Sequence, residues 1–125
     1  MSGESLRWLS YAAENLRSAE VLLESGLYNP SLQNAQQAVE KCLKSLLIRH
    51  SLEFKRTHSI AGLRALLAEA GVVVDLSDDE CDLLDSIYLP SRYPLGSALP
   101  DFEPDEELCH RCSEIAERVL NAAGL

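Results

Sequence analysis

The stretch that decides the fold is residues 11–50, YAAENLRSAEVLLESGLYNPSLQNAQQAVEKCLKSLLIRH. Its apolar residues recur at steps of three and four, the spacing that aligns them along one face of an α-helix. Gly26 interrupts the pattern and LYNPS (27–31) follows, which indicates a helix end and a turn. We therefore predict two long helices, over about residues 5–25 and 31–50, and their short link favours an antiparallel pair.

The chain after this pair predicts further, shorter helices. Thr57 or Ser59 is placed to cap a third helix, which ends near Gly71. SDDE (77–80) has the pattern of a capping box, in which a Ser and a Glu satisfy each other's backbone N–H groups at the start of a fourth helix. We expect Pro90 to end this helix, since proline lacks the N–H that a helix interior needs.

A last helix is predicted to begin in EPDEE (103–107), with Pro104 near its first position and acids in its first turn. Gly124 would close it. The predicted architecture is all-α: an up-and-down antiparallel bundle of about five helices built on the long helix pair. A length of 125 residues suits one core, so we expect a single domain over residues 1–125.

Charge and hydropathy limit the kinds of partner. The formal net charge of −9 opposes non-specific nucleic-acid binding, which depends on cations that displace phosphate counterions. Basic residues outnumber acids between Lys41 and Arg64, so a local anion-binding face stays open. No apolar run reaches the ~20 residues of a membrane span, and MSGESLRWLS at the start does not read as a signal peptide. We expect a cytoplasmic protein with no membrane contact.

The four cysteines include one Cys-x-x-Cys pair, Cys109 and Cys112. A structural zinc site usually needs a second pair of Cys or His ligands, and the motif lies inside a helical pattern. We interpret the cysteines as small core or boundary residues, and we expect neither a metal nor a cofactor.

One arginine stands out in an acidic segment. Residues 65–110 contain twelve Asp and Glu, and Arg92 is their only Lys or Arg. It lies in YLPSRYPLGSALP (88–100), between Tyr88 and Tyr93, where prolines stiffen the chain. A guanidinium is planar and permanently charged, which suits a phosphate, and Tyr88 could stack on it or on a base. The alternative is that Arg92 pairs with nearby carboxylates and pins the loop to the bundle.

Three pieces of the sequence resemble the HEPN domain family, whose name abbreviates higher eukaryotes and prokaryotes nucleotide-binding. They are AQQAVEKCLKSLL (35–47), RTHSI (56–60) and RYP (92–94), and the resemblance covers essentially the whole chain in order. It implies a helical bundle built around an antiparallel helix pair and a homodimer. For many prokaryotic members it also implies a minimal nucleotidyltransferase as the partner in a two-component, toxin–antitoxin-like system.

Many members of this family are metal-independent ribonucleases that use an Arg and, shortly after it, a His. Arg92 matches the arginine, but residues 93–99 contain no His. We therefore expect a module that binds a nucleotide, an anion or a partner protein, rather than an enzyme. The alternative is an RNA endonuclease and growth toxin, in which Arg92 steadies the scissile phosphate and His58 or His110 replaces the missing His.

The candidate ligand-binding residues are Arg92, Tyr88, Tyr93, Lys41 and Lys44. The weak candidates for catalysis are Arg92 and His58. The imidazole of His58 could act as a general acid or base. The alternative is that it is a local hydrogen-bond partner at the start of the third helix.

Polar residues also border the apolar stripe of the second helix. Glu40 precedes Lys44 by one helical turn, the favourable order for an ion pair, so a surface pair is an alternative role for Lys44. Gln36 and Gln37 lie close to the same stripe. If these side chains are buried, each needs a polar partner, in a dimer or in a network within the helix pair.

Overall fold

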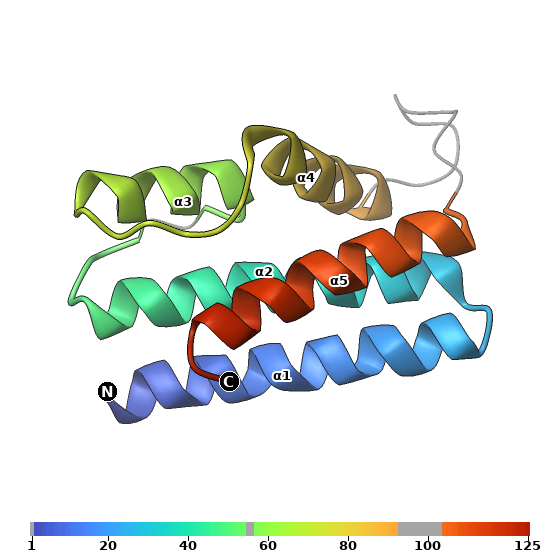
Figure 1. The fold of residues 1–125 in the computed structure, drawn as a ribbon, viewed down its shortest axis with the longest axis horizontal. Helices are drawn as coiled ribbons and strands as arrows, with labels where there is room; N and C mark the ends of the chain where they lie inside the picture. The colour runs from blue at the N-terminus through green and yellow to red at the C-terminus, as the bar shows by residue number, and fades with distance from the viewer. Residues whose placement is uncertain (1, 55–56, 93–103) are drawn as a thin grey trace.

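The computed structural model of the chain describes residues 2–54, 57–92 and 104–125, and for residues 89–92 it describes the backbone alone. No residue in these ranges lies in a strand, which confirms the predicted all-α bundle (Figure 1). Among the described residues, no helix combines the length and the apolar composition that a membrane crossing requires. The described residues form the helices α1 (Gly3–Glu24), α2 (Tyr28–Arg49), α3 (Ile60–Glu69), α4 (Asp78–Arg92) and α5 (Glu106–Ala122).

The second helix, α2, is the centre of the bundle. It packs against α1, α3, α4 and α5, and Figure 1 shows α1 on one side of it and α3 and α4 on the other. A helix that is covered on so many sides cannot keep its polar positions in solvent. Gln36, Glu40 and Lys44 are therefore buried beside core residues such as Leu43 and Leu47.

Serine hydroxyls join α1 and α2 at both ends of the pair. Ser31 donates to the backbone carbonyl of Ala19 at 2.8 Å. At the opposite end Ser45 donates to the carbonyl of Ser5 at 2.8 Å, and Ser5 donates back to the carbonyl of Ser45 at 3.0 Å. Early residues of α1 thus meet late residues of α2, which confirms the antiparallel pair.

The start of α2 lies earlier than the sequence pattern suggested. The helix begins at Tyr28, so Pro30 falls in its first turn rather than in a turn before it. The first N–H groups of an α-helix have no partner within the helix, and a proline there loses no hydrogen bond. Gly26 lies in the short turn between the two helices and has a φ of 74°, a left-handed conformation that favours glycine.

The residues just before α3 lie beside the middle of α2, where Nδ1 of His58 is 3.2 Å from Oε2 of Glu40. Ser59 caps α3 and accepts a hydrogen bond from the backbone N–H of Gly62 at 3.1 Å. Asp85 of α4 adds a second cap: its carboxylate accepts from the N–H groups of Ile60 at 2.7 Å and Ala61 at 3.2 Å. The two bonds from Asp85 hold the start of α3 against α4.

The fourth helix starts as predicted and ends later than predicted. Ser77 and Glu80 form the reciprocal capping box, with bonds of 3.0 and 3.1 Å. The expectation that Pro90 ends the helix is wrong, because α4 continues to Arg92. An interior proline removes one backbone hydrogen bond and crowds the preceding turn, a cost of about 3 kcal/mol that neighbouring turns and packing can offset. Tyr88 and Arg92 consequently lie one turn apart on one helix.

The last helix begins slightly after the predicted position. Asp105 is its N-cap and accepts a hydrogen bond from the N–H of Leu108 at 2.7 Å, so Pro104 precedes the cap instead of lying inside the first turn. An aspartate cap both satisfies an N–H group and favours the positive end of the helix dipole. Gly124 follows the helix with a φ of 101°, as the sequence indicated.

Candidate functional site at the junction of α2, α3 and α4

A buried ion pair lies at the centre of the junction. The ammonium of Lys44 is 3.0 Å from Oε2 of Glu40, one turn earlier on α2, and the two residues are only 7% and 3% exposed. The amide of Gln36 donates to the other carboxylate oxygen of Glu40 at 3.4 Å, and Gln37 donates to Gln36 at 2.8 Å. The polar residues that border the apolar stripe therefore satisfy one another within the helix.

Aromatic rings cover the lysine. The Lys44 ammonium lies 5.6 Å from the ring centroids of both Trp8 and Phe54, a cation–π arrangement. The two rings meet edge to face, with centroids 6.3 Å apart. The predicted ion pair between Glu40 and Lys44 is confirmed, but its predicted place on the surface is wrong. Trp8 of α1 and Phe54 after α2 help to bury it. Lys44 is held by these contacts, and its role in ligand binding stays a prediction.

His58 joins the ion pair to the surface. Its Nδ1 is 3.2 Å from Oε2 of Glu40, while 46% of its side chain is exposed. Its other contact is the ring of Tyr88 on α4, with ring centroids 5.3 Å apart and planes inclined by 22°. The structure thus brings Lys44 and His58 to one carboxylate and places Tyr88 against His58, although the three are far apart in the sequence.

Two candidates from the proline-rich stretch lie at or beyond the end of the described part of α4. Tyr93 lies outside the described residues. Arg92 is the last residue of α4, and its side chain lies outside them too. The backbone places Arg92 one turn beyond Tyr88, and residues four apart lie on the same face of a helix. The backbone at Arg92 therefore lies on the same face of α4 as that at Tyr88.

Lys41 does not belong to this site. It points toward α1, where its ammonium donates to Oδ1 of Asn15 at 2.8 Å and lies 6.0 Å from the ring of Tyr11. Lys44, three residues later on α2, pairs with Glu40 instead, so the two lysines have different partners within the chain.

The other basic residues of segment 41–64 also have partners inside the chain. Arg49 donates to the carbonyl of Ala123 at 2.8 Å, and Arg64 pairs with Asp78. Lys55 and Arg56 lie outside the described residues. Among the described residues, these basic side chains therefore contact groups of the chain itself, and the basic face stays a prediction.

Asp85 is the residue of this junction that sequence reasoning missed. Besides the two N–H groups at the start of α3, its carboxylate accepts from the hydroxyl of Ser59 at 3.1 Å. The N-terminus of a helix is a common place for a phosphate, but here a carboxylate of the same chain occupies it. The only available signal was an acid in an acidic helix, which did not identify its partner.

The cysteines lie in the core. All four are buried and free, and burial raises the pKa of Cys42 and of Cys112 to about 12. Burial likewise raises the pKa of Cys81 and Cys109. Metal binding needs the thiolate, which these surroundings disfavour. Within the part of the chain that the structure describes, no group of three or more His, Cys, Asp or Glu side chains is arranged to hold a metal ion.

Comparison with known proteins identifies the family. The model of the HEPN domain matches residues 5–124. The chain belongs to the HEPN domain family. A protein of Methanocaldococcus jannaschii named "Putative toxin MJ1304" is 28% identical over 126 residues, which cover 90% of this chain and 81% of that protein.

Solved structures of HEPN proteins and their relatives share the whole fold. The crystal structure of ST0689, an archaeal HEPN homologue, superposes with a TM-score of 0.70 at 27% identity and covers 98% of this chain and 96% of its own. The crystal structure of TT1696 from Thermus thermophilus has a TM-score of 0.78 at 28% identity, with 98% and 97% covered. The five described helices are thus the architecture of a HEPN domain.

Proposed function

We propose that this HEPN domain binds a nucleotide where His58 and Tyr88 meet. The observation that supports the proposal best is the stacked ring pair, because flat rings at a surface are the platform on which a nucleobase stacks. Nearly half of the His58 side chain is open to solvent, so a base has access to it.

The buried ion pair strengthens the proposal because it fixes the platform. Glu40 holds the His58 imidazole from below, while Lys44 and Gln36 hold Glu40. A side chain that is already fixed loses little rotamer freedom when a ligand binds. The site therefore has the preorganisation that a small ligand needs for useful affinity.

Arg92 is the residue that we assign to the phosphates. It lies one turn beyond Tyr88 on α4, and a guanidinium forms paired hydrogen bonds with phosphate oxygens. Because Lys41 contacts α1 and Lys44 is buried in its pair with Glu40, the ligand-binding set that we propose is His58, Tyr88 and Arg92. Tyr93 stays a prediction.

Calorimetric titration with a panel of nucleotides tests this assignment. We expect heat from at least one nucleotide, and loss of about tenfold or more in affinity in both His58→Ala and Arg92→Ala, since each removes one charge-assisted or stacking contact. His50→Ala is the matched control, because His50 is an exposed histidine at the end of α2 and is not a candidate for the site. If His58→Ala binds the nucleotide with unchanged affinity, the His58–Tyr88 pair is not part of the nucleotide site.

We further propose that the domain acts as a homodimer and as one half of a two-component system with a minimal nucleotidyltransferase. The family resemblance supports this, as does the relative that bears the name of a toxin. If a neighbouring gene encodes a minimal nucleotidyltransferase, co-expression of the two proteins followed by light scattering on a gel-filtration column tests both points. A monomeric chain that elutes apart from the transferase would contradict them.

A second candidate function is a metal-independent ribonuclease. One observation favours it: the fold brings the exposed imidazole of His58 against Tyr88, one turn from Arg92, although the sequence separates them. His58 would then exchange a proton with the ribose hydroxyl or the leaving oxygen, and Arg92 would stabilise the phosphate. RNA is incubated with the protein in the presence of a metal chelator. Cleavage by the native chain that is lost in both His58→Ala and Arg92→Ala would support this function. Cleavage that survives both substitutions would refute it.

A further inference from the structure

One strip of α2 stays open although other helices cover most of its sides. Between residues 31 and 47 every residue of α2 is buried except four, which are Gln33, Asn34, Gln37 and Lys41. Residues three and four apart are neighbours on the surface of a helix, so these four form one line. This line, the α2 strip, is the part of the central helix that a partner can reach.

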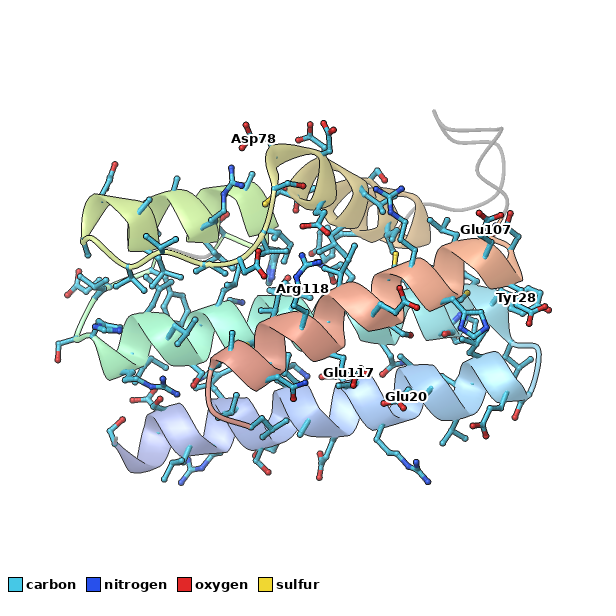
Figure 2. All side chains as sticks on the ribbon, in the orientation of Figure 1. Glu20, Tyr28, Asp78, Glu107, Glu117 and Arg118 are labelled. Atoms are coloured by element: carbon cyan, nitrogen blue, oxygen red, sulfur yellow. The ribbon has the colours of Figure 1, made fainter. Side chains whose placement is uncertain are left out.

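The α2 strip differs in charge from the rest of the molecule. It consists of three amides and one lysine, whereas the chain has 20 Asp and Glu and a net charge of −9. Figure 2 shows acids on the other helices, with Glu20 on α1, Asp78 on α4 and Glu117 on α5. Two copies of so acidic a chain repel each other over most of their surfaces. A contact centred on the amides of α2 avoids this repulsion.

Neutral groups of α1 border the α2 strip and hold it in place. Asn15 donates from Nδ2 to Oδ1 of Asn34 at 2.9 Å and accepts at its own Oδ1 from Lys41 at 2.8 Å. The ring of Tyr11 lies 6.0 Å from the Lys41 ammonium, and Tyr11 is 47% exposed. Tyrosine is enriched in protein interfaces. Side chains that are already held lose little rotamer freedom when a partner binds.

Gln37 offers an open hydrogen-bond acceptor in the middle of the α2 strip. The Glu40 carboxylate only accepts, so the bond from Nε2 of Gln36 to Oε1 of Glu40 at 3.4 Å orients the Gln36 amide. Oε1 of Gln36 then accepts from Nε2 of Gln37 at 2.8 Å. The carbonyl oxygen of Gln37 accepts no hydrogen bond from a described residue, and its amide nitrogen has a second N–H. One partly exposed amide thus presents both a donor and an acceptor.

We propose that the α2 strip is the surface on which a second copy of this chain docks. The inference rests on the proposed homodimer and names the surface that forms it. A two-fold dimer brings the same patch of both copies together, so each group at the centre must suit itself. An amide meets this condition because it both donates and accepts. The two α2 helices cross at Gln37, where each amide donates to the carbonyl oxygen of the other.

Light scattering on a gel-filtration column, over a series of protein concentrations, tests the proposal. We expect the native chain to be a dimer and Gln37→Glu to raise its dissociation constant by about tenfold or more, because two carboxylates then face each other. The matched control is Asn121→Asp, which makes the same change from amide to acid at an exposed position on α5. It should change the dissociation constant by less than about twofold.

A disulfide cross-link locates the crossing point directly. The four native cysteines are buried, so mild oxidation should join two copies only through an introduced thiol. A disulfide requires Cα atoms about 4.4–6.8 Å apart. Gln37→Cys should therefore give a covalent dimer, whereas Asn121→Cys should stay unlinked. If Gln37→Glu loses its helical circular dichroism spectrum, the cross-link decides the question.

The possible failures separate this inference from the proposal on which it rests. A native chain that stays monomeric at every concentration would overturn the homodimer and the α2 interface together. Equal weakening of a native dimer by Gln37→Glu and Asn121→Asp, or no covalent dimer of Gln37→Cys, would overturn the α2 interface alone. The copies would then meet through another face.

Discussion

The imidazole of His58 lies nearly parallel to the ring of Tyr88, with ring centroids 5.3 Å apart. This contact joins the segment before α3 to α4, and Glu40 of α2 holds the same imidazole through a 3.2 Å contact to Nδ1. Three elements that are distant in the sequence thus meet at one partly exposed histidine. The proposed function depends on this meeting point.

Removal of the Glu40 charge should strongly destabilise the bundle. Glu40→Gln keeps the shape but leaves the Lys44 ammonium buried without its counter-charge, which typically costs about 3–5 kcal/mol. Chemical denaturation measures the free energy of unfolding. The double variant Glu40→Gln/Lys44→Met should recover most of the loss, because it buries no charge. A loss below about 1 kcal/mol in the single variant would contradict the buried pair.

Asp85 should matter for stability more than the other acids of α4. Its carboxylate accepts two backbone N–H groups at the start of α3 and the Ser59 hydroxyl, so Asp85→Ala should cost about 2 kcal/mol. Asp82→Ala, at an exposed position on the same helix, is the control and should stay within about 0.5 kcal/mol. Equal effects of the two changes in thermal or chemical unfolding would show that α3 does not need this cap.

Glu80 should make stability depend on pH. Burial alone would raise its pKa, but the hydrogen bonds from Arg118 and from Ser77 outweigh burial and lower it. A lowered pKa means that the folded state holds the ionised form more tightly than the unfolded chain does. The resulting stability is present above the unfolded pKa of about 4.3 and is lost as the pH falls through the folded pKa.

Glu80→Gln isolates this effect, since glutamine can still complete the capping box with Ser77. The variant should be less stable than the native chain by about 1 kcal/mol at pH 7. That difference should shrink toward zero as unfolding is measured at progressively lower pH. A difference that stays constant down to about pH 3 would indicate a packing effect instead.

The cysteines should resist modification in the folded protein. Burial raises the pKa of Cys42 and Cys112 to about 12, and raises that of Cys81 and Cys109, so little thiolate is present at about pH 8. A chromogenic disulfide reagent should therefore titrate few thiols quickly in the native chain and all four after denaturation. Rapid native reaction of Cys109 and Cys112 would reopen a redox or metal role for that pair.

Local patterns predicted much of this fold because they act over one or two helical turns. The helix pair follows from the apolar spacing of residues 11–50, and the capping box from Ser77 and Glu80. Pro30 and Pro90 misled the prediction of helix ends, because proline disfavours a helical position only by an amount that the helix start or the surrounding packing can offset.

The site was harder to predict because its contacts join distant segments. The sequence named His58, Tyr88 and Lys44 as candidates, yet nothing in it showed that His58 and Tyr88 stack. Burial of Lys44 depends on Trp8 and Phe54, which come from other elements. The same holds for Asp85, whose partners at the start of α3 lie about two dozen residues earlier in the chain.

Magnetic resonance of the aromatic rings tests the central claim most directly. A nucleobase that stacks on the platform shifts the ring resonances of the residues it covers. On addition of the nucleotide that gives heat, we predict saturable shifts at His58 and Tyr88 with the same dissociation constant as calorimetry. Tyr11, an exposed ring on α1, should shift little. If the calorimetric signal saturates while the resonances of His58 and Tyr88 stay in place, or if Tyr11 shifts most, the nucleotide does not bind at the His58–Tyr88 pair.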